Sequence, residues 1–337
     1  MMHKVFLKKN RPFIILLLFI LLLFSSCLGL FLGSVPLSPG QVIRALFSQN
    51  KDVAYTLVTA VRIPRVAGGL FAGMGLGCAG VILQGVMNNS LASPNTIGVN
   101  SGSGFAVMLA MMLFPNLPGL IPAFAFSGAL LTTLFVFLLA YLADSSRTTI
   151  VLAGITVSSF FNAGINAIKL LDNELSINLT SFMAGSLSGL TVNKLILPCC
   201  CILAAFILSL FLAGSLNVLG LGEDIARSLG MRVPLVRFIL LALASLMAGC
   251  VVSYAGLLSF VGLIVPHICR QLFGNDARFL LPCCGLLGGS FVLVCDLLGR
   301  TLFSPYELPA GILLAFVGGP FFLYLLLKKK GGRRVNA

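Results

Sequence analysis

Charged residues are scarce in this 337-residue chain, at 9% of the sequence, and only nine residues are acidic. Tryptophan is absent, and the two histidines are His3 and His267. A soluble domain needs more charge than this, because about 25% of the residues in ordinary globular proteins are charged. With 58% hydrophobic residues and a mean hydropathy of +1.08, the sequence is typical of a polytopic membrane protein.

The shortage of ionisable side chains also limits the chemistry of the chain. A metal site needs several ligands, so we expect His267 to cap or hydrogen-bond rather than to bind a metal. The ten cysteines have no C-x-x-C spacing and lie mostly in apolar runs, where small packing residues are expected. Clustered His, Asp or Glu residues of the kind that a membrane-embedded enzyme needs are also missing from the sequence.

Ten apolar runs indicate membrane spans, since a spanning helix takes about 20 residues. The predicted spans are 13–33, 64–87, 97–114, 121–143, 149–170, 194–214, 236–254, 257–272, 280–299 and 309–327. The first could be a processed secretion signal ending near Cys27, but its length favours an uncleaved helix. No linker divides the chain, so we expect a single all-α domain over residues 1–337.

The distribution of basic residues predicts the orientation. Short basic tails occupy 1–11 and 328–337, and the positive-inside rule then places both termini in the cytoplasm. With ten spans, 15 of the 22 Lys and Arg residues fall inside. The net charge of +13 therefore indicates a membrane orientation rather than nucleic-acid binding.

Residues 215–235 form a polar insert between two apolar runs, on the predicted cytoplasmic side. Glu223 and Asp224 suit the first turn of a short helix, Arg227 its last turn, and Gly230 a left-handed cap. Such a helix is either a structural cap of the loop or a docking element for a soluble partner.

Three arginines lie on the predicted outer side, against the general charge bias. Arg62 and Arg65 begin the second span and Arg300 ends the ninth. They could snorkel to lipid headgroups, or Arg300 could pair with Asp296 on its own helix. Alternatively they form a basic docking surface for acidic residues of an external partner.

The fifth span carries Ser158, Asn162 and Asn166 at a spacing of four residues, which predicts one polar face on an apolar helix. This face could line a wet passage or could join helices by hydrogen bonds. Glycines at 69, 73 and 77 in the second span instead indicate close helix packing.

Several motifs occur in an order that identifies a family. They are Arg62-Ile63-Pro64-Arg65, then Gln84, Asn89, Leu91-Ala92, Pro94 and Gly98, then Ala184-Gly185-Ser186-Leu187, the run Leu219 to Gly230, the run Ser259 to Arg270, the run Asp296 to Arg300, Glu307-Leu308-Pro309-Ala310-Gly311, and Gly319-Pro320-Phe321-Phe322. From about residue 35 to 328 the chain resembles the FecCD-type, BtuC-like permeases of ABC importers for ferric siderophores, haem and cobalamin. Departures occur at 88–90, at 256–259 and at Phe182, where the family often has Trp.

The resemblance implies a BtuC-like fold of ten helices in the bacterial cytoplasmic membrane, and a homodimer or heterodimer with a similar permease. It implies that two cytoplasmic ATPases dock on the helix at 222–231, and that an extracytoplasmic binding protein docks on Arg62, Arg65 and Arg300. The expected coupling residues are Glu223, Asp224, Arg227, Ser228, Leu229 and Gly230. ATP and Mg would bind the ATPase, and this chain would hold no cofactor of its own.

The sequence shows no energy source for transport within this chain, which agrees with the implied ABC importer. The chain has no G-x-x-x-x-G-K-[ST] motif, so it cannot form that phosphate site itself. A stand-alone ion-coupled transporter remains the alternative, but the carboxylate chains of proton-coupled pumps are missing from the spans. We therefore predict a non-enzymatic permease subunit that imports a ferric siderophore, or haem or cobalamin, by ATP-driven alternating access.

Overall fold

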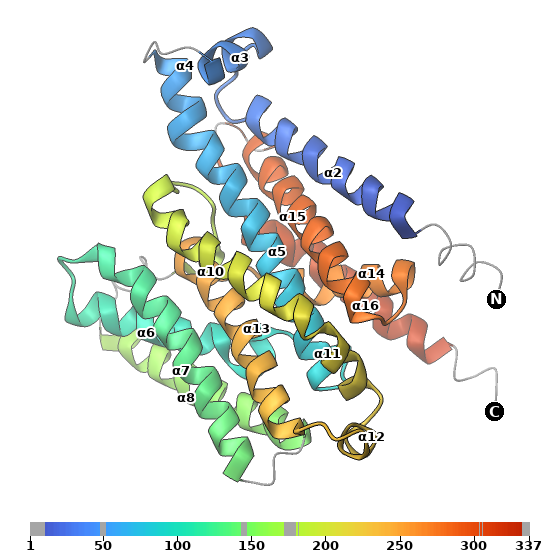
Figure 1. The fold of residues 1–337 in the computed structure, drawn as a ribbon. Helices are drawn as coiled ribbons and strands as arrows, with labels where there is room; N and C mark the ends of the chain where they lie inside the picture. The colour runs from blue at the N-terminus through green and yellow to red at the C-terminus, as the bar shows by residue number, and fades with distance from the viewer. Residues whose placement is uncertain are drawn as a thin grey trace.

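A computed structural model describes residues 11–47, 52–142, 147–171, 180, 182–302, 304 and 306–331. Within these ranges the chain is helical and contains no strand (Figure 1). The helices are α2 (Arg11–Phe31), α3 (Pro39–Phe47), α4 (Val53–Thr56), α5 (Ile63–Val86), α6 (Val99–Leu113), α7 (Ile121–Leu142), α8 (Arg147–Leu171), α10 (Val192–Phe211), α11 (Ala213–Gly220), α12 (Glu223–Ser228), α13 (Val233–Ala255), α14 (Val261–Phe273), α15 (Ala277–Thr301) and α16 (Ala310–Gly331). A π-helix, Leu57–Arg62, joins α4 to α5, and short 3-10 turns occupy Pro94–Ile97 and Pro118–Leu120.

Each of the ten predicted spans overlaps one of these helices, so the predicted all-α membrane fold is confirmed. Seven helical segments are long and apolar enough to cross a membrane, and three shorter apolar helices occupy Val99–Leu113, Val261–Phe273 and Ala310–Tyr324. The number of spans that cross the bilayer and the cytoplasmic placement of the termini stay predictions. The basic tail residues Lys4, Lys8, Lys9, Arg333 and Arg334 lie outside the described residues.

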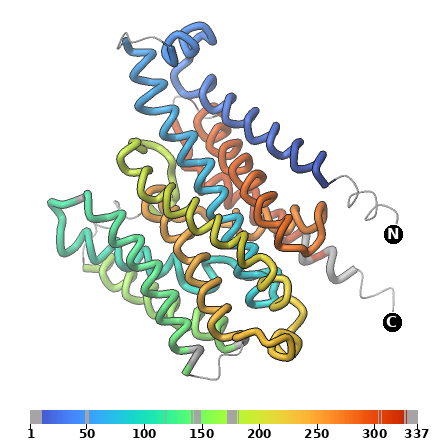
Figure 2. Tube along the Cα trace, in the orientation of Figure 1, coloured from blue at the N-terminus to red at the C-terminus, as the bar shows by residue number. Residues whose placement is uncertain are grey.

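Helix α5 lies at the centre of the fold, where it packs against α13, α14 and α15 (Figure 2). Its glycines make this possible. A Cβ atom added at Gly73 would overlap the carbonyl oxygen of Gly288 on α15, and one at Gly77 would lie 2.7 Å from the carbonyl oxygen of Cys284. The glycine stripe is therefore a packing face, as the sequence predicts.

The predicted span at 257–272 is shorter in the structure, because residues 256–260 are irregular and α14 begins only at Val261. Gly256 and Phe260 both adopt positive φ, at 68° and 66°. The loop is nevertheless hydrogen-bonded, since Leu257 N donates to Phe182 O at 3.1 Å and Ser186 N donates to Ala255 O at 2.9 Å. Internal partners of this kind allow irregular backbone at membrane depth.

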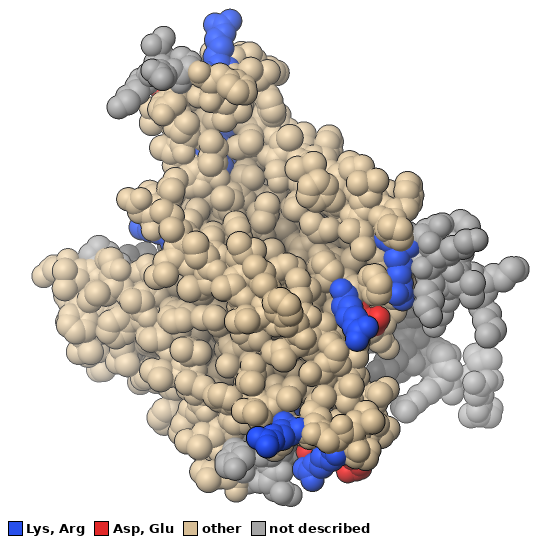
Figure 3. Space-filling view, viewed as in Figure 1, with Lys and Arg blue, Asp and Glu red and all other residues tan. Residues whose placement is uncertain are grey.

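The two ends of the molecule differ. The start of α2 and the short helix α12 lie toward one end, and α3 and α4 lie at the other (Figure 1). The side chain of Arg11 fixes the start of α2 at the first end, because its Nη2 donates to Phe273 O at 3.4 Å and its guanidinium lies 4.2 Å from the centre of the Phe279 ring. Between the ends the surface is broad and almost free of charged side chains, as expected for a face in contact with lipid (Figure 3).

Candidate functional site

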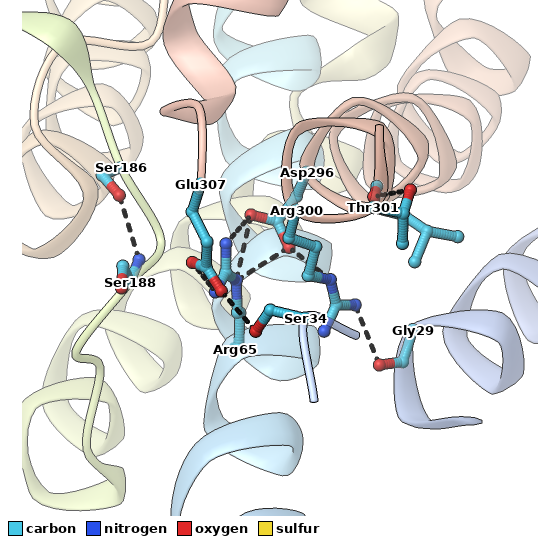
Figure 4. A network of polar contacts seen from close by, with 10 residues as sticks. Gly29, Ser34, Arg65, Ser186, Ser188, Asp296, Arg300, Thr301 and Glu307 are labelled. Carbon is cyan, nitrogen blue, oxygen red and sulfur yellow. Dashed lines mark hydrogen bonds and ion pairs between the residues drawn. The ribbon is translucent and has the colours of Figure 1, made fainter. Parts of the chain in front are cut away.

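The end that carries α3 and α4 contains an ionic network between segments far apart in the sequence. Arg65 on α5 binds Asp296 on α15 through two nitrogens, with Nε to Oδ2 at 2.9 Å and Nη2 to Oδ1 at 3.0 Å (Figure 4). Its third nitrogen, Nη1, donates to Oε2 of Glu307 at 2.7 Å. The other carboxylate oxygen of Glu307 accepts a hydrogen bond from Ser34 Oγ at 2.8 Å. The network therefore joins α5, α15, the segment before α16 and the segment after α2.

The other two of these arginines, Arg62 and Arg300, hold the end of α2 in place. Arg300 lies 3.6 Å from Asp296 Oδ2, and its Nη2 donates to Gly29 O at 2.9 Å. Arg62 donates to the carbonyl oxygens of Leu30, Phe31 and Val35 at 2.6 to 2.9 Å. The carbonyl groups of Gly29, Leu30 and Phe31 belong to the C-terminal end of α2, where they have no partner within the helix, and that of Val35 belongs to the segment after it.

All three predicted docking arginines are brought together, but they are buried. Arg62, Arg65 and Arg300 are 4%, 5% and 3% exposed. The pairing of Arg300 with Asp296, one of the alternatives left open by the sequence, is present. Docking of an external partner on these arginines stays a prediction, and the structure adds that each guanidinium already has partners within the chain.

Glu307 is the part of this network that sequence reasoning missed. Its side chain is 28% exposed, whereas that of Asp296 is 2% exposed. Burial alone would raise the pKa of Glu307, but hydrogen bonds from Arg65 and Ser34 outweigh it and lower the pKa from its ordinary value. The available signal was that Glu307 lies in the same predicted loop as Arg300, at the boundary of the tenth span, where a carboxylate and an arginine of opposite charge could meet.

The polar insert folds into two short helices, α11 and α12. As predicted, Glu223 and Asp224 lie in the first turn of α12 and Arg227 lies in its last turn. Gly230 has a φ of 79°, which confirms the predicted left-handed residue after the helix. Pro234 lies in the first turn of α13, where proline is well tolerated.

The predicted coupling residues have two different environments. Asp224, Arg227, Ser228, Leu229 and Gly230 are exposed. Glu223 points inward, since its Oε2 accepts a hydrogen bond from Nη2 of Arg237 at 2.9 Å. Arg237, on α13, is 1% exposed and was not identified from the sequence. Any direct contact of Glu223 with a partner therefore competes with this internal ion pair.

Three apolar side chains form a stripe on the exposed side of the insert. Leu221, Ile225 and Leu229 are 63%, 48% and 65% exposed and are spaced four residues apart. The only buried residue of α12 is Ala226. Ile225 lies on α12, Leu221 lies just before it and Leu229 just after it. A short polar insert that exposes three large apolar side chains has the composition of a protein-binding surface.

A cleft of about 560 Å³ lies between this insert and the ends of α5 and α14. Arg270 lines it and hydrogen-bonds the side chain of Gln84. On its other side, Asn217 Nδ2 donates to Asp276 Oδ1 at 2.8 Å, and the Asn217 side-chain oxygen accepts from Ala277 N at 2.7 Å. These contacts join α11 to the N-terminus of α15, so the insert is held to the membrane helices at more than one point.

The predicted polar face of the fifth span lies on α8. Asn162 and Asn166 are exposed, and Ser158 is half-buried beside Gly98. Neither asparagine side chain makes a hydrogen bond to the residues that the structure describes, whereas the hydroxyl of Ser159 donates to Ile155 O at 3.0 Å. Unpartnered carboxamides on a spanning helix are costly in lipid, so this face requires either water or another protein surface.

Metal-binding geometry is missing from the part of the chain that the structure describes. Those residues hold no group of three His, Cys, Asp or Glu side chains that could bind a metal. His267 has a polar neighbour in Gln271, with Nε2 of each side chain 2.9 Å apart. The ten cysteines are free thiols, and six of them are buried among the helices.

The sequence matches the model of the FecCD transport family over residues 20–328. It is 34% identical to the Fe(3+)-citrate import system permease protein YfmE of Bacillus subtilis (strain 168), over 96% of this chain and 98% of that protein. It is 32% identical to the hemin transport system permease protein HmuU of Yersinia pestis, over 95% of this chain and 96% of that protein.

A solved structure resembles the fold over nearly the whole chain. This structure is described as an inward-facing conformation of a metal-chelate type ABC transporter. Its TM-score to the present structure is 0.82 at 30% sequence identity, and the match covers 94% of this chain and 99% of the other.

Proposed function

As a member of the FecCD transport family, this chain is a multi-pass permease subunit of an ABC importer in the cytoplasmic membrane, and we propose that its substrate is a ferric siderophore. Relatives named for ferric citrate and for hemin support a bulky iron chelate as the substrate class. As a transport subunit it performs no covalent chemistry. The proposed energy source is ATP hydrolysis in separate cytoplasmic subunits, which drives alternating access of the pathway.

The observation that carries the ATP-driven mechanism is the apolar stripe on α12 and the residues that flank it. Leu221, Ile225 and Leu229 project from an insert that lies at the same end as the start of α2. We propose that a groove on the ATPase covers this stripe, with Asp224 and Arg227 at its polar edge. Burying three large apolar side chains stabilises such a contact by about 1.5–3 kcal/mol per residue.

Replacing Ile225 by Asp tests this contact, because Ile225 is the central residue of the stripe. We expect the variant to fold normally, since the side chain is exposed, and to lose co-purification with the ATPase and ATP-dependent uptake. Leu235→Asp, at another exposed position near the start of α13, serves as the control. Retention of both the ATPase and uptake in the Ile225→Asp variant contradicts the proposed contact.

We propose that the polar face of α8 lines the substrate pathway between this permease and a second permease subunit, identical or similar. The support is that Asn162 and Asn166 are exposed and lack hydrogen bonds to the described residues, while large apolar side chains cover much of the remaining exposed surface of α8. A water-filled pathway hydrates both carboxamides. Hydration in the pathway explains why a membrane-spanning helix carries two exposed asparagines.

We further propose that an external binding protein docks at the end that contains Arg62, Arg65 and Arg300. Because these side chains are buried, acidic residues of the partner reach them only by displacing internal partners such as Glu307. Arg65→Gln is expected to weaken binding of the binding protein at least tenfold. Glu307→Gln is the control, because it removes a partly exposed partner of Arg65 from the same network but keeps all three arginines. Equal loss in both variants indicates a structural role for the arginines instead.

Reconstituted uptake tests the substrate and the energy source together. Proteoliposomes containing the permease, its ATPase and its binding protein are supplied with a ferric hydroxamate, ferric citrate, haem or cobalamin. We expect uptake of a ferric siderophore that stops without ATP. Uptake of haem or cobalamin alone overturns the substrate proposal. Uptake by the permease alone, driven by an ion gradient, overturns the ABC mechanism and supports a stand-alone transporter.

A further inference from the structure

Helix α12 is too short to keep its position alone. It has six residues, and isolated helices of this length are unstable in water. Two backbone features shape the turn after it. Met231 N donates to Ala226 O at 3.1 Å, and Gly230 adopts a φ of 79° in open space, since a Cβ atom added there would have no neighbour within 4 Å. Residues 229–232 therefore form a short linker with a glycine at its centre.

An ion pair joins α12 to the membrane helices. Glu223 Oε2 lies 2.9 Å from Nη2 of Arg237, fourteen residues later. The side chain of Arg237 is 1% exposed, so water cannot replace its carboxylate partner without opening the structure. Arg237 is among the largest fully buried side chains of the described chain.

Glu223 also binds Arg227, but that contact is different in kind. Arg227 lies on α12 itself, and its side chain is 64% exposed. It therefore stabilises the short helix locally, and among the described residues its ion pair does not connect α12 to another helix. Arg237, by contrast, belongs to α13, which packs against α5, α7 and α10 at the centre of the molecule. Among the residues that the structure describes, only the Glu223–Arg237 pair connects α12 to this core by an ion pair.

We propose that Glu223 and Arg237 are positioning residues that transmit motion of α12 to α13. This inference rests on the proposed ATPase docking at the stripe of Leu221, Ile225 and Leu229. With the ion pair intact, a displacement of the stripe moves the first turns of α13 as well. Without it, α12 pivots about the linker at Gly230, and ATP hydrolysis continues without moving the transport pathway.

The test measures the number of substrate molecules imported per ATP hydrolysed, in proteoliposomes containing the complete importer. We expect Glu223→Gln and Arg237→Gln each to lower this ratio at least tenfold while the ATPase still co-purifies, because the apolar stripe is unchanged. Arg237→Lys keeps the charge and should retain more of the ratio than Arg237→Gln. Arg232→Gln is the matched control, because Arg232 is a cation of the same linker with no ion pair to the described residues.

The outcomes separate this inference from the function on which it rests. If the wild-type permease neither binds nor stimulates the ATPase, the proposed function fails. If the wild-type importer is coupled but both Gln variants keep the wild-type ratio, only the transmission role is overturned. Loss of ATPase binding in Glu223→Gln also overturns it, since Glu223 would then be a docking contact. Thermal unfolding of each purified variant confirms that the measured protein is folded.

Discussion

Arg65 and Asp296 are 231 positions apart in the sequence and form a two-nitrogen ion pair between α5 and α15. Both side chains are almost fully buried, at 7% and 2% exposed. Asp296 also lies beside Arg300, so a single carboxylate is shared by two guanidinium groups. The pair fixes the outer ends of α5 and α15, whose glycine-lined faces meet further along the same two helices.

Replacing Asp296 by Asn should strongly destabilise the fold. The substitution leaves Arg65 and Arg300 buried without their shared carboxylate, and breaking a buried ion pair from one side costs about 3–5 kcal/mol. Reversible unfolding of the purified permease in mixed micelles measures this change. Glu307→Gln is the comparison, because Glu307 is partly exposed and its loss should cost less. Similar values for the two variants would show that burial does not govern the strength of the network.

The sequence predicted the grouping of the three arginines but not their environment. Arg62, Arg65 and Arg300 were placed at one end of the molecule because span boundaries determine the side on which a residue falls. Their burial depends on how α2 ends and on where Glu307 lies, and both are properties of tertiary packing. Span boundaries along a sequence therefore locate such a cluster without showing whether it faces solvent.

Replacing Gly73 by Ala should destabilise the permease by about 1–3 kcal/mol, the usual cost of inserting a methyl group into a tightly packed contact. The new Cβ would overlap the backbone of Gly288, which cannot move without separating α5 from α15. Gly319→Ala in α16 is the matched control, because nothing lies within 4 Å of its Cβ position. The melting temperatures of both variants and of the wild type measure this destabilisation. Equal stability of all three contradicts close packing at Gly73.

Helical periodicity located the long helices well, and local signals located α12. Periodicity did not predict the break at residues 256–260, because an apolar run continues through that loop. The hydrogen bond from Leu257 N to Phe182 O, which helps to stabilise the loop, is a tertiary contact that periodicity does not show. Helix α3 was also missed, although its start carries a reciprocal pair of capping hydrogen bonds between Ser38 and Gln41. The Ser-x-x-Gln spacing before Val42 was a usable signal.

The attachment of α12 should weaken in acid. Burial alone would raise the pKa of Glu223, but hydrogen bonds and charge from Arg237 and Arg227 outweigh it, so the pKa lies below its ordinary value of 4.5. For a carboxyl group with a lowered pKa, the stabilisation is complete above the unfolded-state pKa and is lost as the pH falls through the folded-state value.

The difference in melting temperature between the wild type and Glu223→Gln measures this effect. We expect a constant difference at about pH 6–8 and a decreasing difference below about pH 4.5, where the unfolded-state carboxyl begins to bind protons. Asp224→Asn is the control, because Asp224 is the exposed neighbour on the same turn. A difference that does not change with pH would contradict the charge-dependent attachment.

Replacing Asn162 and Asn166 together by Leu should change transport with little effect on stability. Both side chains are exposed and make no hydrogen bond to the described residues, so the fold of one subunit does not depend on them. If their face lines the pathway, the double variant makes it apolar and reduces uptake at least tenfold, while the permease dimer and ATP hydrolysis persist.

Uptake in proteoliposomes and the dimer fraction from size-exclusion chromatography are measured on the same preparation. Leu152→Ala and Phe160→Ala, on the exposed apolar part of α8, serve as controls. Loss of the dimer in the asparagine variant would instead show that the two carboxamides join the subunits by hydrogen bonds.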